Sequence, residues 1–493
     1  MRALLISTYD MGRQPFGLAS PAAWLRAAGI DVTCADLSKD RLAPDAVHAA
    51  SLVGFFLPMH TATRLALPVI DRVRALNPSA RLVAYGLYAP LNEELLRQRG
   101  IHEILNGEFE EDLVRAALKG CATPSGEGAR ASSAVLNRVE PWPVLDRVEP
   151  WPVLDRVEPW PVLDRVEPWP VLNRVEPWPI PRLVFKVPQR DGLPPLSRYA
   201  AIQVGDERRV TGYTEASRGC KHRCRHCPIV PVYGGRFRVV APDIVLADVR
   251  AQVASGARHI TFGDPDFFNG IGHARAVLEG FGRECPGVSY DVTIKIEHLL
   301  RHADALPLLR ETGCAFVTSA VEAIDDRVLG YLEKGHTRAD FERAVALCAE
   351  AGVPLSPTFV TFTPWTTIES YREFLSEIGR LGLVEHVAPI QYAIRLLVTN
   401  KSRLLELDDI RRLVQPFDPV SLTYPWTHPD PRVDRLHHIV SGIVGVRITA
   451  PRTEIFAQVW GAAHAGEESL LRRQLPVLPS RASIPYLTEP WYC

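Results

Sequence analysis

Apolar and polar positions alternate in blocks along the first 120 residues. Short apolar runs, each suited to one buried strand, occupy residues 3–7, 31–34, 52–56 and 81–86. Segments between and after them predict helices over residues 21–28, 67–76 and 91–99, with Pro68 in the first turn of the second. This alternation favours an α/β fold with a parallel, doubly wound, Rossmann-like sheet. Ligands of such sheets lie at the carboxyl ends of the strands, where residues 9–17 and 86–90 are expected to form loops.

The same alternation resumes near residue 199 and continues past residue 395. The predicted strands cover residues 259–263, 290–296, 315–319, 355–362 and 389–396. The predicted helices cover residues 244–254, 274–281, 338–351 and 368–381. Repeated βα units over residues 196–410 predict a partial (β/α)6 barrel of the TIM type, in which catalytic groups lie at the carboxyl ends of the strands. The rhythm is then lost, and residues 411–493 are expected to form a small, mostly helical extension and tail.

A tandem repeat of nine residues separates the two halves. Five nearly identical copies fill residues 136–179, and each carries one tryptophan: Trp142, Trp151, Trp160, Trp169 and Trp178. Two prolines in each copy prevent a continuous helix or a central strand, so residues 121–195 are expected to form an extended or turn-rich linker. A docking segment and a spacer are functional interpretations of the repeat. Recent expansion of a single linker copy explains the near-identity more simply.

Composition narrows the class of protein. The chain has 493 residues, of which 46% are hydrophobic and 23% are charged, and this balance is typical of a globular protein with two or three domains. The formal net charge is −1 and no block of lysine or arginine stands out, so nothing indicates binding to nucleic acid or to an anionic membrane. We find no signal peptide and no apolar run of about 20 residues, which predicts a cytoplasmic protein with reduced thiols.

Three cysteines, Cys220, Cys224 and Cys227, stand in one short segment with the spacing C-x3-C-x2-C. Three thiolates on one loop can hold three irons of a four-iron, four-sulfur cluster and leave the fourth iron open to a non-protein ligand. A structural zinc site would need His222 or His226 as its fourth ligand, and the chain has no second C-x2-C pair. A disulfide role is disfavoured because the nine cysteines are an odd number. The spacing therefore favours an iron–sulfur cluster.

Polar residues follow the predicted barrel strands on the side of the cysteines. They occupy four stretches: residues 263–266, 295–298, 319–322 and 391–395. A barrel mouth that offers carboxylates, hydroxyls and a base beside an open iron suits a zwitterionic ligand that also carries a ribose. With the cysteine triad, these stretches make residues 196–400 resemble the radical SAM enzymes.

The resemblance implies a set of site residues. In that family the triad binds a 4Fe-4S cluster, and S-adenosylmethionine (SAM) on the open iron is cleaved by one electron to methionine and a deoxyadenosyl radical. Cys220, Cys224 and Cys227 would be the metal ligands, with His226 at the place usually held by an aromatic residue. The implied cofactor contacts are Gly263, Asp264 and Asp266, which replace a Gly-Gly-Glu turn of the family, together with Lys295, Glu297, Ser319, Glu322 and Arg395. Lys295, Glu297 and Arg395 are equally well explained as members of a buried ion-pair network.

The N-terminal domain resembles the cobalamin-binding domain that precedes many radical SAM methylases and cyclases. The Asp-x-His-x-x-Gly motif that donates an axial histidine in other cobalamin proteins is missing from this sequence. Cobalamin would therefore have to bind without that ligand. The alternative is a domain that has kept the fold and lost the cofactor.

The tail carries a finer resemblance. Residues 484–493, with the segments 218–236 and 263–270, are similar to radical SAM proteins whose tails end in CUAEP or CCAEP, where U is selenocysteine. Cys493 stands where that tail would begin. Because a stop codon encodes selenocysteine, one hypothesis is that the true chain reads on through it. The alternative is that Cys493 is an ordinary thiol or a metal ligand.

The sequence thus favours a radical SAM enzyme with a small-molecule or peptide substrate and an electron donor of the flavodoxin or ferredoxin type. Methylation, rearrangement and sulfur insertion all remain open as the reaction. A methylthiotransferase acting on transfer RNA is disfavoured, because those enzymes carry additional N-terminal cysteines and a basic C-terminal domain. A non-catalytic iron–sulfur carrier or regulator, and a selenium- or sulfur-handling redox protein, are the alternatives from other classes.

Overall fold

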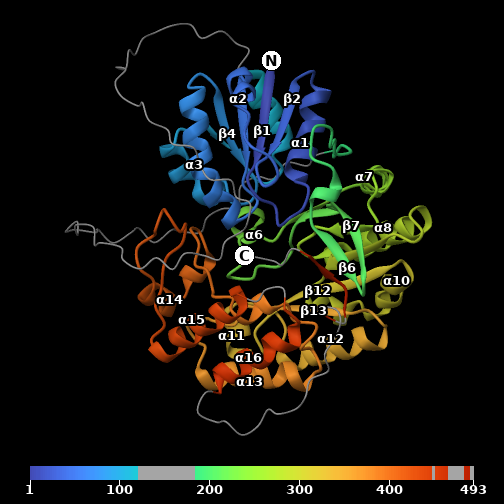
Figure 1. The fold of residues 1–493 in the computed structure, drawn as a ribbon, viewed down its shortest axis with the longest axis vertical. Coiled ribbons are helices and arrows are strands. Elements are labelled where there is room, and N and C mark those ends of the chain that lie inside the picture. Colours follow the sequence, from blue (N-terminus) through green and yellow to red (C-terminus); the bar gives the residue numbers. More distant parts are fainter. Residues whose placement is uncertain (120–183, 447–449, 465–481, 483, 489–493) are drawn as a thin grey trace, which may run out of the picture.

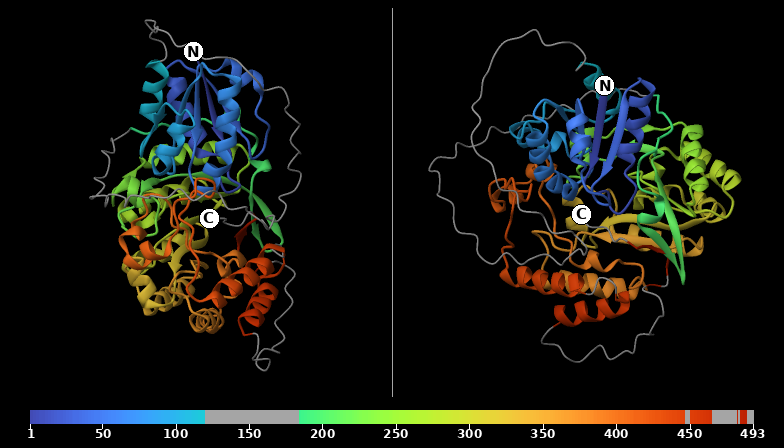
Figure 2. Two further views of the ribbon diagram at one scale, coloured as in Figure 1. Left: turned by 90° about the vertical axis from the view of Figure 1, so that its left-hand side faces the viewer. Right: turned by 45° about the horizontal axis from the view of Figure 1, so that its top comes forward.

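The computed structural model describes residues 1–119, 184–446, 450–464, 482 and 484–488. The nine-residue repeats and Cys493 lie outside the described residues. Figure 1 shows the N-terminal domain above a second α/β unit, with a helical C-terminal region below, and both views of Figure 2 show the same stacking. None of the helices in the described part of the chain is long and apolar enough to cross a membrane.

The N-terminal domain is a five-stranded parallel sheet in the order β2-β1-β3-β4-β5. Its strands are β1 (Arg2–Ser7), β2 (Asp31–Asp36), β3 (Leu52–Phe56), β4 (Arg81–Tyr85) and β5 (Glu103–Ile104). This is the flavodoxin-like version of a doubly wound fold, in which a ligand binds where the strand order reverses, between β1 and β3. In Figure 1 the carboxyl ends of these strands point toward the second unit.

Helices cover both faces of this sheet because successive strand side chains point to opposite sides. Leu5 and Tyr85 belong to one core with α1 (Phe16–Ala27) and α5 (Glu110–Lys119). The other face packs against three helices: α2 (Pro44–Ala49), α3 (His60–Leu76) and α4 (Glu93–Gln98). Both faces of each strand are therefore buried. This explains why the strands appear in the sequence as short, continuous apolar runs.

Two helix starts were predicted too late. The helix expected from residue 21 begins at Phe16, and the helix expected from residue 67 begins at His60. Pro21 and Pro68 therefore lie inside helices, and the prediction that Pro68 stands in a first turn was wrong. Proline is favoured in the first turn because its missing N–H costs no hydrogen bond there. That preference was outweighed by the burial of the residues that precede each proline.

The second unit is a seven-stranded sheet in the order β13-β12-β11-β10-β7-β6-β14, curled into a half-barrel. Five strands run parallel: β7 (Glu207–Thr214), β10 (His259–Phe262), β11 (Ser289–Thr293), β12 (Cys314–Glu322) and β13 (Leu355–Phe359). β6 (Ala201–Val204) and β14 (Tyr486–Leu487) extend one edge antiparallel. Helices on its outer side include α7 (Pro242–Ala254), α8 (Ile271–Glu284), α12 (Arg338–Glu350) and α13 (Ile368–Arg380). The α/β fold class predicted from the sequence is confirmed.

The sixth barrel strand expected over residues 389–396 is not a strand. Its first half forms a 3-10 helix, η5 (Pro389–Tyr392), and pairing with the sheet is reduced to a single bridge between Phe362 and Arg395. Pro389 has no N–H to give to a ladder, which disfavours an extended start. The C-terminal region follows as α14 (Asp408–Leu413), α15 (Pro431–Val446) and α16 (Arg452–Ala463), as expected for a mostly helical extension.

A buried charge cluster joins the two units. Arg218, on the short strand β8 (Ser217–Gly219), makes ion pairs with Glu108 at 3.1 Å, Glu110 at 2.7 Å and Glu215 at 2.7 Å. The side chains of Glu108 and Glu110 are fully buried and that of Arg218 is 7% exposed. Three carboxylates therefore share one guanidinium. Burial, together with the neighbouring glutamates, raises the pKa of Glu108 from 4.5 to about 7 even though Arg218 lowers it.

The raised pKa of Glu108 predicts how stability depends on pH. Folding takes up a proton on Glu108 between its unfolded pKa of 4.5 and its folded pKa of about 7, so its contribution to stability is full below pH 4.5 and is lost as the pH rises through 7. In a Glu108→Gln variant this loss is removed. When the pH is raised from 5 to 8, we expect the free energy of unfolding of the variant to increase by on the order of 1–3 kcal/mol relative to that of the wild type. Urea unfolding of both proteins at pH 5 and at pH 8 measures this change. The prediction is contradicted if the stability difference between variant and wild type is the same at the two pH values.

Candidate active site at the cysteine loop

The cysteine loop joins β8 to α6 (Ile229–Tyr233). Gly219, directly before Cys220, has a φ of +74°, and a Cβ there would lie 2.4 Å from the Tyr233 ring and 2.5 Å from a backbone oxygen. Only glycine fits this turn without rearrangement. Cys220, Cys224 and Cys227 are all free thiols, and Cys224 is the most buried of them. The loop thus presents three unpaired sulfurs in one place.

Gly263 and Asp264, expected to contact the cofactor, support the entry to this loop. A Cβ on Gly263 would lie 1.7 Å from the Tyr213 hydroxyl, so the tyrosine leaves no room for any other residue. Asp264 is buried, and its carboxylate accepts hydrogen bonds from the Ala216 amide at 2.9 Å and from the Ser217 hydroxyl. Burial raises the pKa of Asp264 to about 7. Both residues hold the strand that leads into the cysteines.

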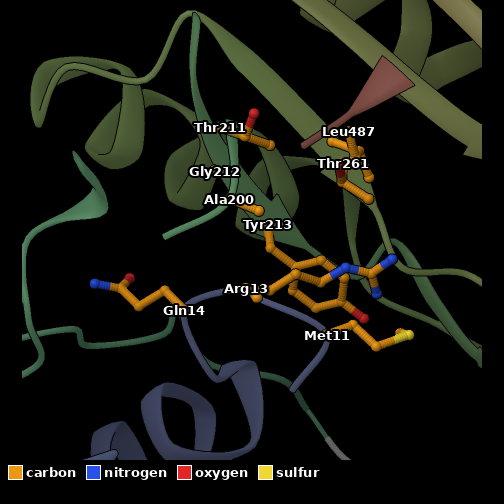
Figure 3. Close-up of a pocket in the computed structure, with 10 residues that line it drawn as sticks. Met11, Arg13, Gln14, Ala200, Thr211, Gly212, Tyr213, Thr261 and Leu487 are labelled. Carbon is orange, nitrogen blue, oxygen red and sulfur yellow. The ribbon is translucent and has the colours of Figure 1, made fainter. Parts of the chain in front are cut away.

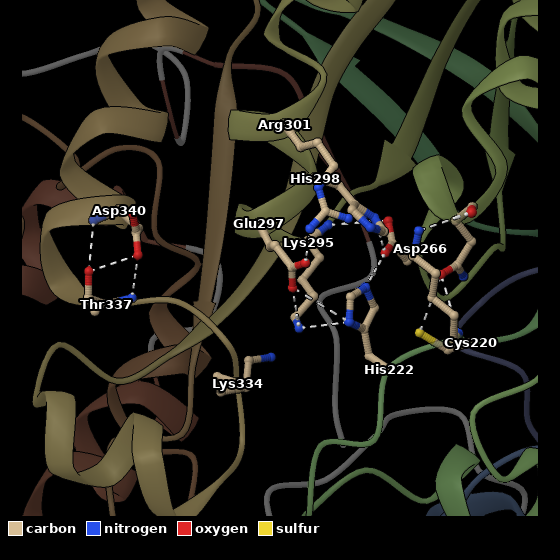
Figure 4. A network of polar contacts seen from close by, with 12 residues as sticks. Cys220, His222, Asp266, Lys295, Glu297, His298, Arg301, Lys334, Thr337 and Asp340 are labelled. Atoms are coloured by element: carbon tan, nitrogen blue, oxygen red, sulfur yellow. Dashed lines mark hydrogen bonds and ion pairs between the residues drawn. The ribbon is translucent and has the colours of Figure 1, made fainter.

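Asp266, Lys295 and Glu297 lie together in a polar network beside Cys220 (Figure 4). Lys295 is the N-cap of α9 (Ile296–Arg301), and its Nζ lies 3.0 Å from His222 Nδ1 and 3.4 Å from Glu297 Oε2. Asp266 faces the imidazoles of His222 and His298. The cysteine loop enters this network through His222, which stands between two of its cysteines.

Glu322 and Ser319 lie at the end of β12, and Glu322 contacts the cysteine loop through His226. Glu322 adopts a φ of +72°, a conformation that costs about 1–3 kcal/mol for a residue other than glycine. Its Oε1 lies 3.1 Å from His226 Nε2 and 3.2 Å from Lys334 Nζ. Burial raises the pKa of Glu322, but the charges of Lys334 and His226 outweigh it and lower the pKa to about 2. Ser319 is fully buried, and its hydroxyl has no hydrogen-bond partner among the described residues.

Lys334 and His336 were missed from the sequence. They lie in the loop that follows α11 (Asp326–Tyr331), and both are nearly buried. Burial and the charges of Lys334 and Lys295 lower the pKa of His336 to about 4, and neither of its ring nitrogens has a partner in the described part of the chain. Gly335 between them has a φ of +72°. The Lys-Gly-His sequence is the signal that could have identified these two residues. It was missed because it follows a helix, whereas the site residues were expected after strands.

Arg395 lies outside this group. Its guanidinium pairs with Asp434 on α15 at 2.7 Å, donates to the Trp426 carbonyl at 2.9 Å and lies 3.7 Å from the centre of the Trp426 ring. Of the two interpretations of Arg395, the arrangement matches the structural ion pair.

A second feature lies where the two units meet. A small pocket is lined by Met11, Gly12 and Arg13 from the loop after β1, by Tyr213 from β7 and by Leu487 from β14, among others (Figure 3). The Arg13 guanidinium lies 4.7 Å from the centre of the Tyr213 ring. The carboxyl end of β1 thus faces the half-barrel. His60, at the start of α3, is 2.5 Å from the Ser421 carbonyl, so its ring is engaged by the C-terminal region.

The chemistry of these residues fits an iron–sulfur cluster and a polar ligand. Three free thiols on one loop match the ligand set of a 4Fe-4S cluster that keeps one open iron. Buried polar atoms are normally hydrogen-bonded, so the orphaned Ser319 hydroxyl and His336 imidazole indicate that a polar molecule completes the site.

Comparisons with known proteins agree with this chemistry. Residues 214–378 match the model of the radical SAM superfamily. Among curated relatives, the tRNA-2-methylthio-N(6)-dimethylallyladenosine synthase of Chlorobaculum tepidum is 25% identical over 241 residues, which cover 44% of this chain and 53% of that protein. The chain spans about half the length of the curated relatives that it matches.

Solved structures share the fold. The structure of the radical SAM methyltransferase TsrM from Kitasatospora setae with tryptophan substrate and a SAM analog bound has a TM-score of 0.59 at 17% identity, and the match covers 98% of this chain and 93% of that chain. The cobalamin-dependent SAM radical enzyme OxsB with aqua-cobalamin bound has a TM-score of 0.61 at 13% identity, covering 89% and 66%. At such identities the likeness shows the fold alone.

A radical SAM domain implies a 4Fe-4S cluster and SAM, and the donor atoms described above fit both. The matched residues contain the whole cysteine loop, the parallel strands β10 to β13, and the orphaned polar groups at their carboxyl ends. Residues 214–378 of the chain therefore form a domain of the radical SAM superfamily type.

Proposed function

We propose that this protein binds a 4Fe-4S cluster through Cys220, Cys224 and Cys227 and uses it to cleave SAM reductively, in order to modify a small-molecule or peptide substrate. The observation that carries the proposal is the set of three free thiols beside buried polar groups that have no partner among the described residues. When bound, the cluster supplies the electron that cleaves the sulfonium.

The chain's own residues suit an amino-acid ligand with a ribose. Glu322 is ionised and fixed by Lys334 and His226, so it can accept hydrogen bonds from an ammonium or from ribose hydroxyls. The Ser319 hydroxyl and the neutral His336 ring add a donor and an acceptor. Lys334 can pair with a carboxylate if it leaves Glu322.

Deoxyadenosine formation tests the proposal. Anaerobically reconstituted protein should convert SAM to methionine and deoxyadenosine only when dithionite is present, and chromatography with mass detection measures both products. Reduced flavodoxin or ferredoxin should replace dithionite if the natural donor is of that type. A cluster that assembles while calorimetric titration shows no SAM binding would instead support a non-catalytic carrier or regulator.

Cobalamin is proposed as a second cofactor, held at the carboxyl edge of the N-terminal sheet. The support is the strand order 2-1-3-4-5, the orientation of that edge toward the half-barrel, and the fold shared with cobalamin-dependent enzymes. Since His60 is engaged with Ser421, the cofactor would bind without an axial histidine from this residue. Absorption spectra of protein incubated with hydroxocobalamin and then desalted test the binding.

Methyl transfer is then a better-supported reaction than methylthiolation. Residues 1–119 contain one cysteine, Cys34, so they offer no second cysteine triad.

Membership of the subgroup with CUAEP or CCAEP tails is proposed from the sequence around Cys493. Reading the DNA beyond codon 493 tests it, because an in-frame stop codon followed by Ala-Glu-Pro codons is required.

A further inference from the structure

Three side chains from three different elements meet beside the cysteine loop (Figure 4). His222 comes from the loop itself, Asp266 follows β10 as the N-cap of η3 (Phe267–Gly270), and His298 lies in the first turn of α9 after β11. Asp266 Oδ2 is 3.5 Å from His222 Nε2 and 2.6 Å from His298 Nδ1. One ligand atom from each residue falls within 4.8 Å of the others.

These groups are buried, and their hydrogen bonding is incomplete. The side chains of His298, Asp266 and His222 are 0%, 2% and 14% exposed. His222 Nε2, Asp266 Oδ2 and both ring nitrogens of His298 lack a hydrogen bond of acceptable geometry with any described residue. Asp266 Oδ2 and His298 Nδ1 face each other at 2.6 Å, whereas His298 Nε2 has no partner among the described residues, and a buried polar atom left without a partner costs about 1–3 kcal/mol. Something that binds lone pairs would relieve that cost.

We propose that His222, Asp266 and His298 bind a single divalent metal ion, with zinc as the ion that this donor set favours. Two imidazoles and one carboxylate are the protein ligands of many mononuclear zinc sites that keep a position for water. Imidazole and carboxylate are harder donors, in the sense of hard and soft ligands, than the three thiolates. Zinc at His222, Asp266 and His298 and the iron–sulfur cluster at the cysteines would therefore be separated by ligand type. The site goes beyond the proposed SAM chemistry and does not depend on it.

The surrounding residues can adapt to a bound metal. When His222 binds zinc through Nε2, its Nδ1 must carry the proton and needs an acceptor. Glu297 Oε2 lies 3.7 Å from that nitrogen, and Lys295, 3.4 Å from the same oxygen, can then pair with Glu297 alone. A carboxylate behind a metal-bound histidine is the usual arrangement in zinc sites. The ion would tie the cysteine loop to the ends of β10 and β11.

This proposal gives Asp266 a role other than the SAM contact expected from the family turn. In the structure its Oδ1 faces the amides of Phe268 and Lys295 at 3.3 and 3.4 Å, which leaves Oδ2 for the imidazoles. The two roles predict different results for an Asp266→Asn variant. Loss of zinc with SAM affinity retained supports the metal site, whereas loss of SAM affinity with zinc retained overturns it.

Metal analysis of the reconstituted full chain tests the site directly. With the cluster in place, so that the cysteines are occupied, incubation with zinc and extensive dialysis should leave about four irons and about one zinc per chain. Asp266→Asn and His298→Ala should each lower the zinc content at least about tenfold and leave the iron unchanged. Cobalt in place of zinc should add no sulfur-to-cobalt charge-transfer band to the absorption of the cluster itself.

His302→Ala is the matched control. Its ring centre lies 5.8 Å from that of His298 on the same helical segment, but it is outside the group of three ligands. This variant should keep both metals. The proposal is overturned if the wild type retains no zinc beyond the cluster irons, which would make the three residues a hydrogen-bonded network, or if Asp266→Asn retains as much zinc as the wild type. Because asparagine is isosteric with aspartate, that variant keeps the test valid if His298→Ala does not fold.

Discussion

Replacement of Cys224 by serine is expected to abolish both cluster assembly and deoxyadenosine formation. Cys224 is the middle ligand of the proposed triad and the most buried of the three thiols. A serine hydroxyl is a poor iron ligand, and two remaining cysteines cannot hold a four-iron cluster with a single open site. Reconstitution should therefore give no thiolate-to-iron absorbance, and the rate of SAM cleavage should fall to that of protein without iron.

Cys34→Ser provides the matched control for this experiment. Cys34 is a free, partly buried thiol on β2, in the other α/β unit. The same chemical change there should leave four irons per chain and unchanged deoxyadenosine formation. Retention of the cluster in Cys224→Ser would refute the assignment of the triad, even if the variant had lost activity for another reason.

Replacement of Arg218 by methionine is expected to destabilise the protein by about 3–5 kcal/mol at pH 8. The change leaves Glu108, Glu110 and Glu215 without their shared cation, and two of these carboxylates are fully buried. The rings of Phe16, Phe109 and Phe185, which lie 5.0–5.5 Å from the guanidinium carbon, would then surround uncompensated charge. Urea unfolding curves measure the loss.

Two companion variants separate charge from packing. Adding Glu108→Gln to Arg218→Met should recover part of the lost stability, because one of the buried carboxylates is then neutral. Arg198→Met removes an exposed ion pair with Asp40 and should cost at most about 1 kcal/mol. If Arg218→Met costs no more than Arg198→Met, the buried cluster does not hold the two units together.

The fold was predictable where one local pattern determines it. The strands β1, β3 and β4 are short apolar runs buried on both sides, and their length of five or six residues favours a strand over a helix. The sixth barrel strand failed because residues 389–396 are apolar enough for a strand, while their pairing depends on how far the sheet curls. Curling is set by contacts between distant segments, and these do not appear in a local pattern.

The candidate site also contains residues that a local pattern predicts and residues that it does not. The cysteine triad was readable because all three ligands lie within eight residues of one another. Arg395 was uncertain because its partner, Asp434, stands in a region without a recognisable motif. His298 was noted only as a neighbour of Glu297, since its meeting with His222 depends on the spacing of β11 and the cysteine loop. Contacts between residues that only the tertiary structure brings together cannot be predicted from a local pattern in the sequence.

The short strand β14 has a consequence for how this protein folds. Thr488 accepts a hydrogen bond from the Ala201 amide across 287 positions of sequence, next to the β6–β14 pairing, so that edge cannot close until residues up to Thr488 have been synthesised. Until then β6 presents an open edge, which can pair with another chain. Ordering so large a loop is slow as well as entropically costly. We therefore expect nascent chains to depend on protection from aggregation until β14 docks.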